Sequence, residues 1–169
     1  LKQVLDDRYI RLEAYQNRLW AERFRDAIEA VAAAETALKP GEERLALAAA
    51  KSLYKLMSYK DEYEVARLHY ETSRKLAESI FQPAAEGRGL RLSYRLSPPL
   101  LTRPGKDGRP PKMRVGSWFQ LLRHAKGLRG SPVDPFGWTE ERRLERALIA
   151  GLEKDLRLIA RRLSVANYD

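Results

Sequence analysis

The chain has 169 residues, of which 44% are hydrophobic and 33% charged, and its formal net charge is +9. It contains no cysteine, which excludes disulfides, thiolate zinc sites, a cysteine nucleophile and cysteine-held iron–sulfur clusters among its own residues. No apolar run approaches the roughly 18 residues that a membrane span needs, and the first residues carry no signal peptide, so we expect a cytoplasmic protein without membrane contact. Because the first residue is Leu1, we expect the chain to be a fragment of a larger multidomain protein.

The positive charge is concentrated in one part of the sequence. Residues 1–87 have a net charge of −1 and residues 131–169 a net charge of 0. Residues 88–130 contain 11 Lys/Arg and a single acidic residue, Asp107. A block of this kind indicates an anionic neighbour, whereas evenly spread charge would serve solubility alone.

Helical spacing dominates the first third of the chain. Apolar residues recur every three or four positions over 1–38, with one gap near Gln16, and predict one long helix. The sequence Lys39-Pro40-Gly41 ends that pattern. A second helix is then expected to begin near Glu42 and to end at about Ser58.

Further helices are expected before the basic block. Ser58 has the chemistry of an N-cap for a third helix that reaches Tyr70. Thr72 or Ser73 then caps a short fourth helix that ends near Phe81.

The periodicity changes to two after Gly87. Leu90, Leu92, Tyr94 and Leu96 alternate with polar residues and predict a strand. Residues 103–111 are rich in Pro and Gly and predict an exposed loop, and residues 112–116 are expected to form the returning strand. The segment therefore predicts a long-looped β-hairpin.

The last part of the sequence returns to helical spacing. A short helix is expected over 118–125, followed by a turn-rich connection over 127–137. Thr139 is the expected N-cap of the last helix, whose apolar stripe comprises Leu144, Leu148, Leu152, Leu156, Ile159 and Leu163.

These elements predict a mainly α fold, a long-helix bundle with a β-hairpin insertion. We expect a single helical domain over 1–169, divided into a helical half (1–82), a basic β-hairpin (83–117) and a helical return (118–169).

The densest polar cluster stands at the start of the third expected helix and comprises Tyr59, Lys60, Asp61, Glu62, Tyr63, Glu64 and Arg67. One interpretation is a general acid/base pair or a charge network at a docking surface. The other is a solvated helix face with ordinary ion pairs. No phosphate-binding loop or nucleophile motif occurs elsewhere, and the two histidines are too far apart in sequence to suggest a metal site.

The basic hairpin has three interpretations: a solvated loop, a surface for an acidic protein or domain, and a nucleic-acid interface. Its aromatic residues are too few to favour base stacking. The candidate docking residues are Arg91, Arg95, Arg103, Lys106, Arg109, Lys112 and Arg114.

Four runs of sequence carry a family resemblance: 53–68 (LYKLMSYKDEYEVARL), 96–101 (LSPPLL), 128–137 (LRGSPVDPFG) and 139–149 (TEERRLERALI). Together with 14–17 (AYQN) in the first helix, they resemble the C-terminal region of the indolepyruvate ferredoxin oxidoreductases, which act on 2-oxo acids.

The resemblance implies a parent enzyme that decarboxylates arylpyruvates oxidatively with coenzyme A and ferredoxin. It also implies that the parent uses thiamine pyrophosphate, Mg²⁺ and 4Fe-4S clusters, although this chain has neither the diphosphate-binding motif nor the cysteines to hold them. We therefore expect no catalytic residue, metal or cofactor in the chain itself.

The sequence thus predicts a non-catalytic accessory domain that packs against catalytic domains of its parent or against a partner subunit in an oligomer. Docking of an acidic partner such as ferredoxin through residues 88–130 is the sharper hypothesis. The alternative is a basic nucleic-acid-binding module.

Overall fold

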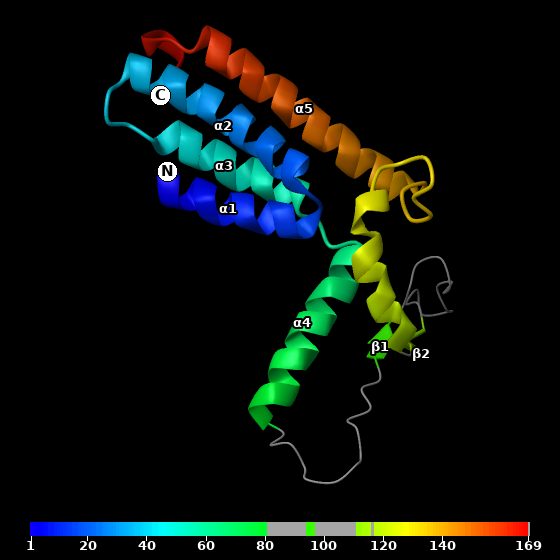
Figure 1. The fold of residues 1–169 in the computed structure, drawn as a ribbon. Helices are drawn as coiled ribbons and strands as arrows, with labels where there is room; N and C mark the ends of the chain where they lie inside the picture. The colour runs from blue at the N-terminus through cyan, green and yellow to red at the C-terminus, as the bar shows by residue number, and fades with distance from the viewer. Residues whose placement is uncertain (81–93, 97–110, 116, 169) are drawn as a thin grey trace. The chain divides into compact units, whose positions relative to one another are not determined.

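A computed structural model describes residues 1–80, 94–96, 111–115 and 117–168 (Figure 1). The chain divides into two compact units. Unit 1 combines Leu1–Tyr59 with Gly130–Asp169, and unit 2 is Lys60–Arg129. The described residues are mainly helical, which confirms the mainly α fold class.

Unit 1 begins with two helices where the sequence predicted one. Helix α1 spans Lys2–Tyr15 and α2 spans Arg18–Leu38. The break comes from Asn17, whose backbone is extended and whose side-chain Oδ1 accepts the N–H of Trp20 at 2.9 Å. An Asn side chain in this position replaces an intrahelical bond and starts a new helix without Gly or Pro. The prediction of one long helix was therefore wrong.

Helix α3 spans Arg44–Met57 and ends close to the predicted position. Ser58 is its C-cap, with both its N–H and its hydroxyl donating to the carbonyl oxygen of Tyr54. Ser58 therefore ends α3 and does not begin the next helix. The prediction that Ser58 is the N-cap of the next helix was wrong.

Helix α5, Glu140–Arg162, begins as predicted, because the Oγ1 of Thr139 accepts the N–H of Arg142 at 3.3 Å. A short 3₁₀ helix, η2 (Val165–Asn167), follows it. The predicted apolar stripe is only partly correct. Leu156 is buried, but Leu144 and Leu148 are exposed.

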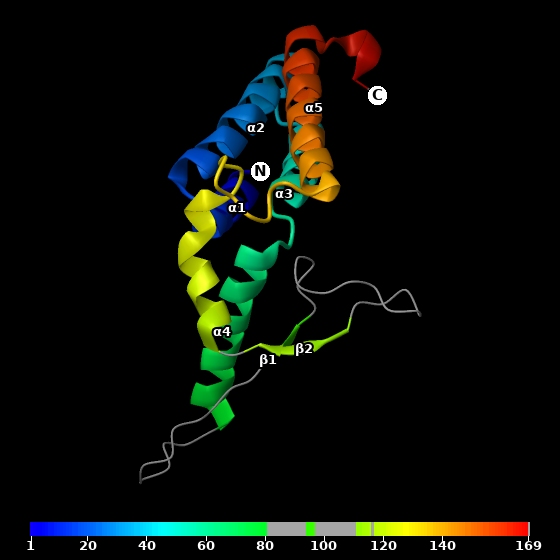
Figure 2. The same ribbon diagram turned by 90° about the vertical axis from the view of Figure 1, so that its right-hand side faces the viewer.

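The core of unit 1 lies around α2, which contacts α1, α3 and α5. Both views show α5 beside α2, and Figure 1 shows these two helices running in the same direction (Figures 1 and 2). The largest buried apolar side chains are Leu12, Phe24, Ile28, Val31, Leu53, Met57 and Ile149.

A buried carboxylate ties three elements of unit 1 together. Glu35 on α2 accepts the backbone N–H groups of Leu45 and Ala46, each at 2.8 Å, and so caps the start of α3. It also accepts the hydroxyl of Tyr168 at 2.6 Å. Burial raises the pKa of Glu35, but the hydrogen bonds from Tyr168, Ala46 and Leu45 outweigh that effect and hold the pKa below its usual range.

A charged pair joins α2 to α5. Arg23 forks onto Glu153, with its Nη2 2.7 Å from Oε2 and its Nε on the other oxygen. Glu153 is only 5% exposed. The helix therefore turns a charged residue toward α2, which places Leu144 and Leu148 on the outside.

The described residues of unit 2 form α4 (Glu62–Ile80), the 3₁₀ helix η1 (Ser117–Leu128) and two short strands, β1 (Tyr94–Leu96) and β2 (Met113–Val115). Helices α4 and η1 pack together, with Ala66 buried beside Val65 and Leu122. Helix α4 runs without a break through the positions where a cap at Thr72 or Ser73 was predicted, so that boundary was wrong.

The two strands pair antiparallel, with Arg95 opposite Arg114. Most of the expected β-hairpin, including nearly all of its loop, lies outside the described residues, so the long-looped hairpin stays a prediction. The predicted segment bounds at 82/83 and 117/118, which lie within the single domain expected over 1–169, follow changes in composition. The boundaries between units, after Tyr59 and after Arg129, follow contacts. Among the described residues, none of the helices has both the length and the apolar character needed to pass through a bilayer.

Candidate functional site

The polar cluster predicted over 59–67 is divided between the two units. Tyr59 belongs to unit 1, where its ring meets that of Tyr15 edge-on with the centroids 6.1 Å apart. The guanidinium of Arg142 lies 4.9 Å from the centroid of the same Tyr59 ring. Lys60, the first residue of unit 2, is exposed, and Glu62 is half-buried in the first turn of α4.

Asp61 organises the start of unit 2. Its Oδ1 accepts the N–H of Glu64 at 2.8 Å, which caps α4 in place of the predicted Ser58. The Nη2 of Arg129 lies 2.8 Å from the same oxygen, and its Nε donates to Oδ2. Both side chains are buried, and the guanidinium lies 5.5 Å from the ring centroid of the buried Tyr63. The carboxylate therefore holds residue 129 against the first turn of α4.

Glu64 is also engaged by an arginine. Arg67 donates to it through Nη2 at 2.6 Å and through Nε at 2.8 Å, and to Glu71 at 2.7 Å. The hydrogen bond to Glu64 is the main reason why the pKa of Arg67 is raised. The carboxylates of Asp61 and Glu64 accept charge-assisted hydrogen bonds that stabilise the start of helix α4.

The basic docking candidates are only partly described. Arg91, Arg103, Lys106 and Arg109 lie outside the described residues. Arg95, Lys112 and Arg114 are exposed. Arg95 and Arg114 face each other across the strand pair, and like charges in this position disfavour pairing unless an anion lies between them.

The loop over 130–137 is a second structured site. The Oδ2 of Asp134 accepts the N–H of Gly130 at 2.8 Å, and its Oδ1 accepts that of Phe136 at 3.1 Å. Gly130 has φ +75°, which favours glycine. A Cβ on Gly137 would lie 2.6 Å from the Oδ2 of Asp134, so the loop closes tightly only around glycine.

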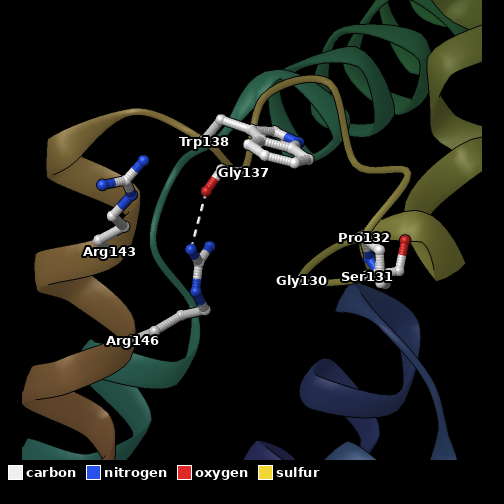
Figure 3. Close-up of a pocket in the computed structure, with 7 residues that line it drawn as sticks. All are labelled: Gly130, Ser131, Pro132, Gly137, Trp138, Arg143 and Arg146. Carbon is white, nitrogen blue, oxygen red and sulfur yellow. Dashed lines mark hydrogen bonds between the residues drawn. The ribbon is translucent and has the colours of Figure 1, made fainter.

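A shallow cavity of about 360 Å³ lies between this loop and α5 (Figure 3). Its lining comprises Gly130, Ser131, Pro132, Gly137, Trp138, Arg143 and Arg146. Figure 3 shows both arginines extending from α5 toward the loop and the indole of Trp138 above them.

The cavity is basic, and only some of the polar side chains that line it have hydrogen-bond partners among the described residues. An Nη of Arg146 donates to the carbonyl oxygen of Gly137 at 2.8 Å, which fixes the side chain in place. Arg143 is exposed and has no hydrogen-bond or ion-pair partner among the described residues. The hydroxyl of Ser131 is buried, also without a partner in the described part of the chain, and Trp138 is 63% exposed.

The profile of a family of unknown function, DUF6537, matches residues 1–169. The chain belongs to the DUF6537 family. No curated protein and no solved structure matches it.

The cavity in this DUF6537 member has the chemistry to bind an anion. Guanidinium groups beside an indole recognise carboxylates or phosphates that carry apolar neighbours. Within the described ranges, no three His, Asp or Glu side chains come together as metal ligands would. Sequence analysis predicted a turn-rich connection over 127–137 and included 128–137 in the resemblance, but it did not identify a binding site there. The spacing of Arg143 and Arg146 after a Gly-bounded loop was the signal that could have indicated the cavity.

Proposed function

We propose that the chain is a non-catalytic accessory domain of an indolepyruvate-type 2-oxo acid ferredoxin oxidoreductase, packed against catalytic domains or a partner subunit. In this proposal thiamine pyrophosphate, Mg²⁺ and the 4Fe-4S clusters belong to other domains of a cytoplasmic parent. The resemblance over 14–17, 53–68, 96–101, 128–137 and 139–149 motivates it.

The observation that carries the proposal is that polar residues within the resembling runs make structural hydrogen bonds inside the chain. Asp61 caps α4 and binds Arg129, and Asp134 ties its own loop through two backbone N–H groups. Thr139 caps α5. A shared sequence whose polar side chains bond within the chain supports a shared architecture, not a shared reaction.

We further propose that residues 83–117 form a β-hairpin insertion that docks an acidic partner such as ferredoxin. The facing pair of Arg95 and Arg114 supports this, because an acidic side chain between them would relieve their repulsion.

The test uses the longer protein that contains this chain. We expect it to reduce ferredoxin, and the small acceptor methyl viologen, in a reaction that requires an arylpyruvate, coenzyme A and thiamine pyrophosphate. Tyr59→Phe and Glu62→Gln should leave kcat within about twofold, because neither group meets the reacting atoms. A longer protein with no 2-oxo acid-dependent reduction would refute the assignment, and loss of kcat in these variants would refute the non-catalytic role.

The docking proposal has a separate readout. Arg95→Glu with Arg114→Glu should raise KM for ferredoxin about tenfold at low salt and leave methyl viologen reduction unchanged. Lys51→Glu with Lys55→Glu on α3 is the matched control, since both lysines are exposed. Equal effects of the two double variants on ferredoxin reduction would contradict docking at the strand pair.

A further inference from the structure

Helix α5 contains seven Lys/Arg and five Asp/Glu, and most of the basic residues lie on one side of it. At 3.6 residues per turn, five basic residues fall within about 80° of one another around the helix axis. We name them the basic stripe: Arg143, Arg146, Lys154, Arg157 and Arg161. The stripe extends over about 27 Å of helix, at a rise of 1.5 Å per residue. All of its members are exposed except Arg146, which is half-buried.

Four of the five members of the stripe have no hydrogen-bond or ion-pair partner among the described residues: Arg143, Lys154, Arg157 and Arg161. Arg146 donates to the carbonyl of Gly137.

Elsewhere in unit 1, arginines on helices pair with nearby carboxylates. Examples are Arg11 with Asp7 at 2.9 Å and Arg18 with Glu22 at 2.7 Å. Like charges three and four residues apart, as at 154, 157 and 161, weaken a helix, so the stripe opposes the stability of α5.

An apolar strip runs beside the basic stripe. Leu144, Leu148 and Leu158 are 60%, 48% and 46% exposed, with Ala147 and Gly151 between them. A Cβ on Gly151 would meet nothing within 4 Å, although glycine is unfavourable in the middle of a helix. Small residues between exposed leucines leave room for another backbone to approach.

We propose that this face of α5 binds an acidic amphipathic helix of a protein partner, with carboxylates on the basic stripe and apolar side chains on the strip of leucines. The inference rests on the accessory role proposed above and names the surface and the chemistry of the partner. The cavity beside Trp138 is one end of this surface, where Arg143 and Arg146 both take part. Exposed Trp and Arg side chains in a concave site are typical anchors of protein interfaces.

Charge and polarity together favour a protein over a nucleic acid. Exposed leucines gain nothing from a phosphate backbone, whereas an amphipathic helix buries them. Glu140 and Asp155 lie on the same side of α5 as the leucines and would repel phosphates. A protein partner can place basic side chains opposite Glu140 and Asp155, which a nucleic acid cannot do.

The test uses the whole chain and a synthetic helical peptide of about 25 residues, long enough to hold helical structure. Its glutamates and leucines occupy two adjacent helical faces. Fluorescence anisotropy compares this peptide with a second in which glutamine replaces every glutamate, and with duplex DNA of similar length. We expect the acidic peptide to bind, more weakly as salt rises, and the other two probes to bind at least tenfold more weakly.

Two double variants locate the site. Arg157→Glu with Arg161→Glu should weaken peptide binding about tenfold, because two attractions become repulsions. Lys51→Glu with Lys55→Glu on α3 should change it less than about twofold. Both pairs are exposed, lie four residues apart and include a basic residue in the last helical turn, so their effects on helix stability are matched.

Failure to bind the acidic peptide, equal loss in both double variants, or tighter binding of DNA would each overturn the proposal. Failure of the assignment to an oxidoreductase is distinguishable from these results, because it is measured by 2-oxo acid-dependent reduction in the longer protein. Peptide binding without that activity would support the proposed binding surface on α5 and refute only the assignment to an oxidoreductase.

Discussion

Glu35→Gln tests whether a buried carboxylate stabilises unit 1. The Gln carbonyl oxygen can still accept from Leu45 and Tyr168, but its amide nitrogen would face the buried N–H of Ala46. An unsatisfied buried donor costs about 1–3 kcal/mol. Loss of negative charge at the start of α3 costs a further ~0.5–1 kcal/mol. We therefore expect a loss of about 2–4 kcal/mol in the free energy of unfolding.

Urea denaturation followed by far-ultraviolet circular dichroism measures this loss. Glu29→Gln is the matched control, because Glu29 is exposed on the same helix, and it should change the free energy of unfolding by less than about 0.5 kcal/mol. A Glu35→Gln variant as stable as the control would refute the reasoning that this carboxylate is the cap of α3.

The pH dependence gives an independent check of the same group. The pKa of Glu35 is lower in the folded chain than its ordinary value of 4.5. Its contribution is therefore complete above the ordinary value and is lost as the pH falls through the folded-state pKa. The difference in stability between the wild type and Glu35→Gln should narrow as the solution is acidified through that range. A difference that widened toward acid would contradict the sign of the shift.

Three further substitutions test the other structured sites by the same denaturation experiment. Asp61→Asn removes the charge that Arg129 binds, leaves a buried guanidinium uncompensated and should cost about 3–5 kcal/mol. Gly137→Ala forces Asp134 from its hydrogen bonds and should cost about 1–3 kcal/mol. Gly151→Ala meets open space and should stabilise the chain by about 0.5–1 kcal/mol. A loss of stability in Gly151→Ala, or none in the other two variants, would contradict these contacts.

Local signals in the sequence predicted the helix ends that depend on neighbouring residues. Thr139 was identified as the cap of α5 because a capping side chain acts within three residues. Asn17 has the same chemistry but stands inside a continuous helical pattern, so periodicity concealed the break between α1 and α2.

Contacts between distant residues explain what the sequence could not predict. In the sequence, nothing distinguishes Glu35 from the other glutamates on the helices. Its structural role depends in part on the hydrogen bond from Tyr168, which is 133 positions away. The exposed positions of Leu144 and Leu148 follow from the pairing of Arg23 with Glu153, which fixes the face that α5 turns to α2. The basic stripe was missed for a related reason, since the net charge of a segment says nothing about how a helix distributes it.

The discontinuity of unit 1 has a consequence for how the chain folds during synthesis. Helix α2 meets its partner α5 through Arg23 and Glu153, which are 130 positions apart. At about 5–20 residues per second, the ribosome needs roughly 7–26 seconds to add that length of chain. Until α5 emerges, the face of α2 that α5 covers has no native partner, while unit 2 is already complete. The contacts of α2 with α1 and α3 can therefore form first, and the part of the unit 1 core between α2 and α5 is completed last.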